Sequence, residues 1–361
     1  MSITSVVSSP RVRRRSTWGF WLRVGLGVLV AAFVLYRFYG VIAVKQIYGP
    51  ETWVRLLVAG LIIGSVYAVI ALGYTLVYGI LFMINFAHGE VMMLGAFAGY
   101  FALEALAVNG FSDRQPLLAL LITFFVGMLT SMLMGITLER IAYRPLRKAP
   151  RLVPLISAIG ASLFLQNAAQ LMFGSQKRTY HNPAIIAQGE GWNLMVAGQA
   201  VTVTYTGVLM FVTSIVLMIG LYLLVQRTKL GRAMRAVAED KATAALMGID
   251  VDRVIVNTFA ISGVLAGAAG VMWGLYTPAI YHYTGFLPGI KAFTAAVLGG
   301  IGNVPGAMLG GIFLGVVESI SPAILDINFQ LKDVIAFSIL VLVLIFRPTG
   351  LLGEVLAEKK L

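Results

Sequence analysis

Three side chains that can hydrogen-bond or ionise, Asn85, His88 and Glu90, lie within an otherwise apolar stretch of the sequence. The flanking residues 61–78 and 91–107 are rich enough in Leu, Val, Ala and Gly to lie in lipid. Polar groups without partners are costly there, so a chain keeps them at membrane depth only where they line a cavity or pack against protein. The pattern predicts a membrane transporter with a broken helix beside its substrate pathway, and Gly89 belongs to the same candidate pathway.

A second apolar run is interrupted by the sequence GGIGNVPG at residues 299–306. Glycine permits tight backbone turns and proline has no N–H to donate, so a helix opens at such a sequence. Interruptions at matching places in two halves of a chain are typical of a transporter built as an inverted repeat, with its pathway at the repeat interface. The alternative is a pair of structural kinks satisfied by neighbouring helices. The candidate pathway residues of this second break are Gly299, Gly300, Gly302 and Asn303.

Two roles are open for Glu90. Near a freed helix N-terminus, its carboxylate would be stabilised by the N–H groups of the first turn. With His88 it could instead form a proton relay. We favour the structural role because no second carboxylate accompanies the pair, and we expect Glu104 and Glu318 to lie at the membrane interfaces.

Another polar group, Gln166, Asn167 and Gln170, falls within about one helical turn of a later apolar segment. A polar face of this kind is expected to look into the bundle. It either forms hydrogen bonds between helices or lines the pathway.

The composition sets the class of protein. The 361-residue chain is 59% hydrophobic and 12% charged, whereas an ordinary soluble domain has about 25% charged residues. It has no cysteine, its three histidines are far apart, and it has no phosphate-binding loop, nucleotide fingerprint or catalytic-triad spacing. We therefore expect a chain that is not an enzyme and binds no cofactor. The net charge of +12 does not indicate nucleic acid, because the basic residues cluster in short loops between apolar segments.

Apolar segments of roughly 20 residues are long enough to cross a bilayer. Because these segments lack strand-like alternation, the sequence predicts an all-α integral membrane protein, a polytopic helix bundle of about eight or nine spans with two broken or re-entrant segments. The expected segments are residues 20–36, 54–74, 75–106 (broken), 117–138, 153–173, 207–225, 255–276, 291–320 (broken) and 334–346.

The loops differ in charge, and this difference predicts their side of the membrane. Basic residues are concentrated in the N-terminal arm and in loops 139–152 and 226–254, whereas loop 277–290 has none. Positive loops stay in the cytoplasm. If the second broken segment enters and leaves on one side, both termini lie in the cytoplasm, and we expect the bacterial inner membrane. The basic start also resembles a secretory signal, but Arg23 interrupts its apolar run and no cleavage site follows, so we expect an uncleaved first span.

The longest basic loop, residues 226–254, carries the strongest functional signal. Residues 232–239 and 241–247 suit two short amphipathic helices bounded by Gly231 and Gly248. Such a helix can seat in a groove on a partner protein. The alternative is a solvated connector, which does not need this length. The candidate coupling residues are Arg232, Arg235, Glu239, Asp240, Leu246 and Gly248.

Longer motifs resemble a known family. Residues 64–79 (GSVYAVIALGYTLVYG) and 83–90 (MINFAHGE) resemble the signature of branched-chain amino-acid ABC transporter permeases of the Liv type. Residues 291–307 (KAFTAAVLGGIGNVPGA) and 347–350 (RPTG) are similar to the C-terminal half of that family.

The resemblance covers residues 53–353 and implies a heteromeric importer. Its partners would be a second homologous permease chain, two ATP-binding cassette subunits that bind the ATP, and an extracytoplasmic substrate-binding protein. Loop 226–254 would then dock on an ATPase subunit. It departs from the importer motif EAAxxxG, because Ala242 and Thr243 stand where Glu and the first Ala are expected.

We therefore divide the chain into a basic arm with an extra transmembrane span (1–50), a permease domain (51–353) and a cytoplasmic tail (354–361). The Arg-rich start, with Arg11, Arg13, Arg14 and Arg15, is expected to meet anionic membrane lipid. The predicted function is import of branched-chain or other small amino acids. The alternatives are a urea or short-amide permease of the same family and an ion-coupled secondary transporter.

Overall fold

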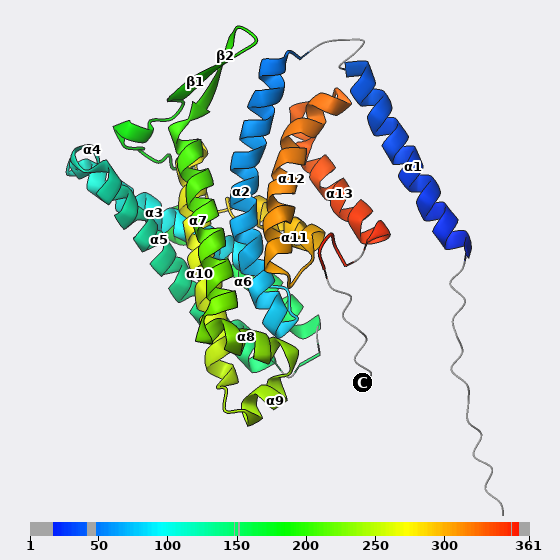
Figure 1. Ribbon diagram of the computed structural model, residues 1–361. Helices are drawn as coiled ribbons and strands as arrows, with labels where there is room; N and C mark the ends of the chain where they lie inside the picture. Colours follow the sequence, from blue (N-terminus) through cyan, green and yellow to red (C-terminus); the bar gives the residue numbers. More distant parts are fainter. Residues whose placement is uncertain (1–16, 42–47, 148, 151, 348, 354–361) are drawn as a thin grey trace, which may run out of the picture.

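The computed structural model describes residues 17–41, 48–147, 149–150, 152–347 and 349–353. The four arginines of the basic arm and the predicted tail lie outside these residues. The described chain is a bundle of helices with one small β-hairpin (Figure 1). Eight of its helical segments are long and apolar enough to cross a membrane. The prediction of a multi-pass, helical membrane protein is therefore confirmed.

The described elements follow the predicted order. They are α1 (Thr17–Tyr39), α2 (Pro50–Leu81), α3 (His88–Val108), α4 (Phe111–Arg114), α5 (Pro116–Leu138), η2 (Glu139–Tyr143), η3 (Arg144–Leu146), α6 (Leu152–Phe173), η4 (Ala184–Ile186), β1 (Gly191–Val196), β2 (Gln199–Thr204), α7 (Tyr205–Arg227), α8 (Lys229–Glu239), α9 (Lys241–Leu246), α10 (Val251–Tyr276), α11 (Phe286–Gly299), α12 (Val304–Leu325), η5 (Phe329–Leu331) and α13 (Lys332–Phe346).

The first break lies where the sequence placed it, but its edges differ. The predicted boundary at residue 74 was wrong, because α2 continues to Leu81. At 1.5 Å per residue this helix is about 48 Å long, more than a bilayer core requires. Phe82 then takes a left-handed conformation (φ 56°) that ends the helix. The irregular segment spans residues 82–87, and α3 begins at His88. His88 and Glu90 thus lie in the first turn of α3 rather than in the break.

The second break separates a short helix from a long one. The predicted start at Lys291 was wrong, because α11 begins at Phe286 and runs for only 14 residues. Asn303 caps α12, its side chain accepting a hydrogen bond from the N–H of Gly306 at 3.0 Å. In Figure 1, α11 runs back from the end of α10 and α12 returns toward the level of the β-hairpin. This course of the chain agrees with a re-entrant segment, and α13 leads back toward the other end of the bundle. Entry and exit on one side of the membrane stay a prediction. The inverted repeat itself stays a prediction.

Glycine pairs allow the central helices to approach closely. A Cβ added to Gly315 of α12 would lie 2.2 Å from the Cα of Gly64 on α2. A Cβ added to Gly267 of α10 would lie 2.5 Å from the carbonyl oxygen of Gly127 on α5. Small residues of this kind let helix backbones touch where lipid provides no hydrophobic drive for association. The central helices α2 and α10 are accordingly the most completely buried spans.

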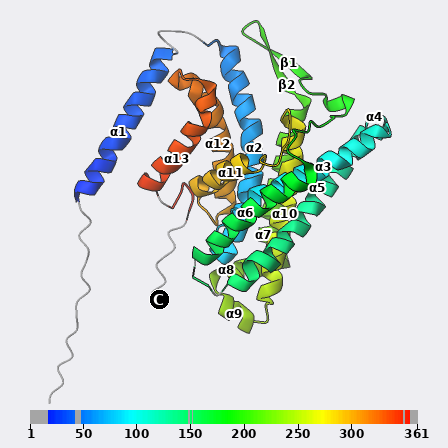
Figure 2. The same ribbon diagram turned by 180° about the vertical axis from the view of Figure 1, so that it is seen from behind.

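The two ends of the bundle differ. One end carries α8 and α9, and the other carries α4 and the β1–β2 hairpin (Figures 1 and 2). The hairpin was not predicted, although strand-forming residues flank a two-residue turn at Ala197 and Gly198. Both turn residues have positive φ, 51° and 83°, as a tight hairpin requires. Helix α1 stands at the edge of the bundle beside α12 and α13 in both views.

Candidate functional site

The site is centred on the carboxylate of Glu90 in the first turn of α3. Glu90 is almost completely buried. Its Oε1 accepts hydrogen bonds from Nε2 of Gln166 at 2.6 Å and from Oγ of Ser162 at 3.2 Å, both on α6. Its Oε2 has no hydrogen-bond partner among the described residues. The positive end of the α3 dipole favours a negative group at this position. The expected hydrogen bonds from the first-turn N–H groups are not the ones that the described residues form, because the donors to Glu90 are the two α6 side chains.

The imidazole of His88 is fitted between α2 and α10. Its Nδ1 lies 3.3 Å from Oγ of Ser262, which donates a hydrogen bond to the carbonyl of Gly73 at 3.1 Å. A Cβ on Gly73 would lie only 2.3 Å from His88 Nε2, so this glycine makes room for the ring. Tyr74 packs edge-on against the ring at a centroid distance of 4.8 Å. Among the residues that the structure describes, no hydrogen bond joins His88 to Glu90, so the two side chains form no direct relay.

The break itself is held by Asn85. Its Oδ1 accepts a hydrogen bond from the hydroxyl of Tyr143 at 2.9 Å, and both side chains are buried. Tyr143 ends η2, where the α5 helix widens into a π-helical turn before the following loop. The amide of Asn85 therefore ties the irregular segment to α5.

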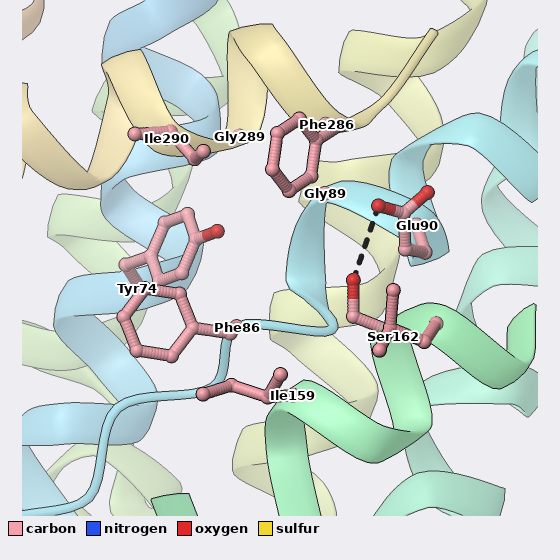
Figure 3. Close-up of a pocket in the computed structure, with 10 residues that line it drawn as sticks. Tyr74, Phe86, Gly89, Glu90, Ile159, Ser162, Phe286, Gly289 and Ile290 are labelled. Atoms are coloured by element: carbon pink, nitrogen blue, oxygen red, sulfur yellow. Dashed lines mark hydrogen bonds between the residues drawn. The ribbon is translucent and has the colours of Figure 1, made fainter. Parts of the chain in front are cut away.

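A small cavity opens beside Glu90. Its volume is about 90 Å³, and Figure 3 shows the side chains that surround it. Apolar side chains form most of the wall, and Glu90, Ser162 and the Tyr74 hydroxyl contribute the polar groups. The lining residues are Tyr74, Phe86, Gly89, Glu90, Ile159, Ser162, Leu163, Phe286, Gly289 and Ile290. Ile159, Leu163 and Phe286 are also partly exposed on the surface of the chain.

Helix α11 forms one wall of this cavity by direct backbone contact with α3. A Cβ on Gly89 would lie 2.5 Å from the carbonyl oxygen of Gly285 and 3.3 Å from the Cα of Gly289. Gly89 thus serves close packing, and the two broken segments meet here. Of the first predicted set, Gly89 and Glu90 line the cavity, whereas Asn85 contacts Tyr143 and His88 contacts Ser262.

The predicted residues of the second break lie elsewhere. Gly299 is ten residues beyond Gly289, which corresponds to about 15 Å along α11. The carbonyls of Leu298 and Gly299 accept hydrogen bonds from the N–H groups of Leu351 and Leu352, at 2.7 and 3.0 Å. Asn303 Nδ2 donates to the carbonyl of Leu352 at 2.9 Å. The freed backbone groups are therefore satisfied by the C-terminal segment of this chain.

The two remaining glycines of this break have a positive backbone φ angle. Gly300 and Gly302 have φ of 105° and 94°, which residues with a side chain rarely adopt. A Cβ on Gly300 would lie 2.4 Å from the N of Gly353. These glycines therefore serve a tight turn, in which Gly300 packs on the C-terminal segment and Gly302 faces Gly79 of α2.

Two further predictions on polar residues were partly wrong. Gln166 is buried as expected, but Asn167 and Gln170 are exposed on the surface of α6. Among the described residues, Asn167 donates to the carbonyl of Leu163 in its own helix, at 2.7 Å. Glu318, expected at an interface, is 3% exposed and lies inside the bundle, because a lysine on α11 provides it with a partner.

The predicted coupling loop forms α8 and α9. The first helix begins before Gly231, at Lys229, because Thr228 caps it by accepting from the N–H of Gly231 at 3.0 Å. Asp240 caps α9, and Gly248 follows it with φ 83°. Buried Met234 and Val237 seat α8 against the ends of α2 and α10.

The opposite side of α8 and α9 is open. Arg232, Arg235, Glu239 and Asp240 are exposed, and Leu246 and Met247 are 87% and 79% exposed. Arg235 donates to the carbonyl of Val225, so it also holds α8 to the end of α7. Large apolar side chains with this exposure at the end of a bundle are typical of an interaction site.

Several residues of the site were missed. Ser162 and Ser262 are single small residues within apolar helices, and Tyr143 lies in the basic stretch after α5, so no sequence pattern marks them. Tyr74 lies in the quoted motif of residues 64–79, where the motif could have indicated it.

Comparison with known proteins agrees with this architecture. Residues 56–344 match a family described as branched-chain amino acid transport system / permease component. The chain is 47% identical to the high-affinity branched-chain amino acid transport system permease protein BraD of Pseudomonas aeruginosa over 314 residues, 86% of this chain and 99% of that protein. It is 42% identical to LivH of Escherichia coli, a permease protein of the same description, over 83% of this chain and 95% of that protein.

A more distant relative, a probable branched-chain amino acid transport permease protein LivH of Methanocaldococcus jannaschii, is 29% identical over 82% of this chain and 92% of that protein. The comparison with solved structures found no match. Helix α1 lies outside the matched range. The extent of the family match and the identities show that this chain belongs to the permease components of branched-chain amino acid transport systems.

Proposed function

We propose that this chain is the membrane-spanning permease subunit of a binding-protein-dependent ABC importer, and that it forms part of the translocation path for branched-chain amino acids. ATP hydrolysis then belongs to separate subunits. The observation that carries the proposal is the meeting of the two broken segments, α3 and α11, at a cavity with an apolar wall and one buried carboxylate. An apolar wall suits an aliphatic side chain, and the polar groups suit the zwitterionic end of an amino acid.

The path runs along the cavity beside Glu90. Of the predicted pathway residues, Asn85, His88, Gly89 and Glu90 hold or line this region. The roles of Gly299, Gly300, Gly302 and Asn303 in the path are indirect, because they fix the turn between α11 and α12. In this proposal, movement of α11 against α3 opens and closes the path.

A second permease chain covers α6. Asn167 and Gln170 are exposed on a helix whose other exposed residues are apolar, among them Leu163. Polar amides facing lipid in the bilayer are unfavourable, whereas amides between helices can form hydrogen bonds. The cavity opens near the same surface, so a partner permease on α6 would complete the path.

The ATPase subunits dock on α8 and α9. The exposed Leu246 and Met247 enter a groove of the ATPase, and the charged residues around them, Arg232 and Glu239, set the orientation. This end is then cytoplasmic, in agreement with the basic residues of the neighbouring loops, and the β-hairpin end meets the substrate-binding protein. The membrane is the bacterial inner membrane, and both termini are cytoplasmic.

Affinity purification of the chain in mild detergent tests the assembly. We expect a second permease chain and two ATP-binding cassette subunits to co-purify. Deletion of residues 232–248 should abolish ATPase recovery and uptake while the chain still reaches the membrane. Uptake at wild-type rate by this deletion variant, at normal expression, would contradict coupling through α8 and α9.

The substrate is tested with the complex reconstituted in liposomes with its binding protein. We expect ATP-dependent uptake of radiolabelled leucine that unlabelled isoleucine and valine inhibit. Uptake of urea or acetamide without leucine uptake would instead favour the short-amide alternative. Leucine uptake driven by an ion gradient in the absence of ATPase subunits would favour a secondary transporter.

A further inference from the structure

A cluster of four charged residues reaches from the interior of the bundle to its surface, apart from the Glu90 site. Nζ of Lys291 on α11 is 2.8 Å from Oε1 of Glu318 on α12 and 2.6 Å from Oδ1 of Asp333 on α13. Nζ of Lys332 is 3.7 Å from the same oxygen of Glu318. The hydroxyl of Tyr67 on α2 lies 3.5 Å from it. Four helices therefore meet at one group of charges.

The burial of this cluster is uneven. The side chains of Lys291 and Glu318 are 6% and 3% exposed, whereas those of Asp333 and Lys332 are 35% and 46% exposed. The two cations balance the two carboxylates, as the high cost of an unpaired charge in a membrane protein requires. Lys291 is the buried cation at the centre of the group, and neither the translocation path nor the ATPase contact explains it.

Helix α11 connects this cluster to the cavity. Gly289 and Ile290 line the cavity, and Lys291 follows them directly. Because an α-helix turns by about 100° per residue, Lys291 leaves α11 on nearly the opposite side from Gly289. The side facing α3 makes glycine backbone contacts without polar side chains. The ion pairs on the other side are therefore directional side-chain contacts of α11. Together with the backbone hydrogen bonds at the end of the helix, they set its rotation and depth.

We propose that Lys291 is a positioning residue, whose ion pairs with Glu318 and Asp333 hold the short helix α11 against α3 and thereby fix the cavity wall beside Glu90. The inference rests on the proposed role of this cavity in translocation. In this proposal the cluster fixes the position of α11, a role that packing of α12 against α13 alone would not require.

The natural chain has no cysteine, so a single Ile290→Cys substitution places the only thiol of the chain on the cavity wall. The labelling rate of this thiol by a charged, water-soluble thiol reagent is measured in the complete transporter in native membranes. The test variants are Lys291→Met, Lys291→Arg and the double variant Lys291→Met/Glu318→Gln. The matched control is Lys332→Met, which removes the same charge from the exposed edge of the cluster.

The labelling rate follows the population of arrangements in which α11 has moved away from α3, so Lys291→Met is expected to raise it by about tenfold. Lys291→Arg keeps the charge and is expected to restore most of the wild-type rate. Lys332→Met is expected to change the rate by less than about twofold. In the double variant Glu318→Gln also removes the buried carboxylate that would lose its partner in Lys291→Met. The double variant therefore serves as the test if Lys291→Met alone does not insert into the membrane.

A wild-type labelling rate in the double variant, at normal membrane levels, would overturn the proposal. This readout does not depend on transport. A complex that fails to import leucine but shows the expected labelling changes would refute the proposed substrate and leave the positioning role supported.

Discussion

The side-chain amide of Gln166 donates to the carboxylate of Glu90 across 2.6 Å, and this bond joins the middle of α6 to the first turn of α3. Ser162, one turn earlier on α6, donates to the same oxygen at 3.2 Å. A carboxylate at a helix N-terminus is already favoured by the backbone dipole, and the two α6 donors hold it in one orientation. The cavity wall formed by α6 is thereby fixed to the broken helix through a single side chain.

Replacing Gln166 with Leu should destabilise the chain. The substitution removes the shorter of the two hydrogen bonds to a buried carboxylate, and a hydrogen bond to a charged group contributes about 1.5–3 kcal/mol. We expect a lower melting temperature of the purified chain in detergent, and uptake by the assembled complex reduced by about tenfold. Asn167→Leu is the matched control, because Asn167 is exposed and, in the described part of the chain, bonds within α6. Equal melting temperatures of the two variants would show that the Gln166 bond does not contribute to stability.

The tight fit of the His88 ring against Gly73 leads to a second prediction, on the substitution Gly73→Ala. In Gly73→Ala the new methyl group would lie 2.3 Å from His88 Nε2 and 3.2 Å from Ser262 Oγ, so the ring must move. Overpacking in a filled interior costs about 1–3 kcal/mol, and we expect a lower melting temperature together with loss of uptake.

The control for this substitution is Gly160→Ala on α6, where a Cβ meets no atom within 4 Å. This variant should be neutral or slightly stabilising, because alanine is a better helix former than glycine. Normal stability and uptake in Gly73→Ala would contradict the tight fit of His88.

The features of this fold that the sequence predicts are those with a signal in neighbouring residues. Helices were predictable because their apolar segments are long and continuous, as at α7 and α10. The position of the first break was predictable because Asn85 and Glu90 are polar where lipid forbids polarity. Their partners were not predictable, since Ser162 and Tyr143 are distant in the sequence and no local pattern sets them apart from their neighbours.

The errors have a common cause. Helix propensity and hydropathy do not mark the residue at which a break begins, so α2 continued beyond Tyr74 and α11 began before Lys291. Glu318 was expected at an interface because it lies near the end of a predicted segment, and its partner, Lys291, is 27 residues away in the sequence. Ion pairs between helices depend on tertiary packing, which no local pattern records.

A third prediction concerns Asn303, in the second break. Its Oδ1 caps α12 and its Nδ2 donates to the carbonyl of Leu352, so one side chain holds both the helix start and the C-terminal segment. Loss of an N-cap costs about 1 kcal/mol, and Asn303→Ala should lower the melting temperature accordingly. It should also increase proteolysis after residue 346 in detergent, because the C-terminal segment loses one of its attachments.

Asn328→Ala is a useful comparison for this variant. Asn328 also caps a helix, the short η5, through the N–H of Gln330 at 2.9 Å, but it is exposed and holds no distant segment. It should leave proteolysis of the C-terminal segment unchanged. Equal proteolysis in the two variants would show that Asn303 does not secure that segment.

Met247 allows a sharp test of the proposed ATPase contact, because the chain offers a matched methionine at the other end. Met247 follows α9 and is 79% exposed, and Met195 on the β-hairpin is 78% exposed. Neither side chain is buried in the chain, so Met→Ser at either position should leave the melting temperature of the isolated subunit unchanged. If α9 enters an ATPase groove, Met247→Ser removes apolar contact area there, worth about 1–3 kcal/mol at the centre of an interface.

We therefore expect Met247→Ser to weaken ATPase binding by about tenfold or more, measured by titrating the purified ATPase onto the permease in detergent. Met195→Ser should leave ATPase affinity unchanged, because the hairpin lies at the opposite end of the bundle (Figure 1). An equal loss of affinity in both variants would indicate a general effect on the chain. Unchanged affinity in Met247→Ser, and also in the double variant with Leu246→Ser, would exclude this end of α9 as the contact, since these are its most exposed large apolar side chains.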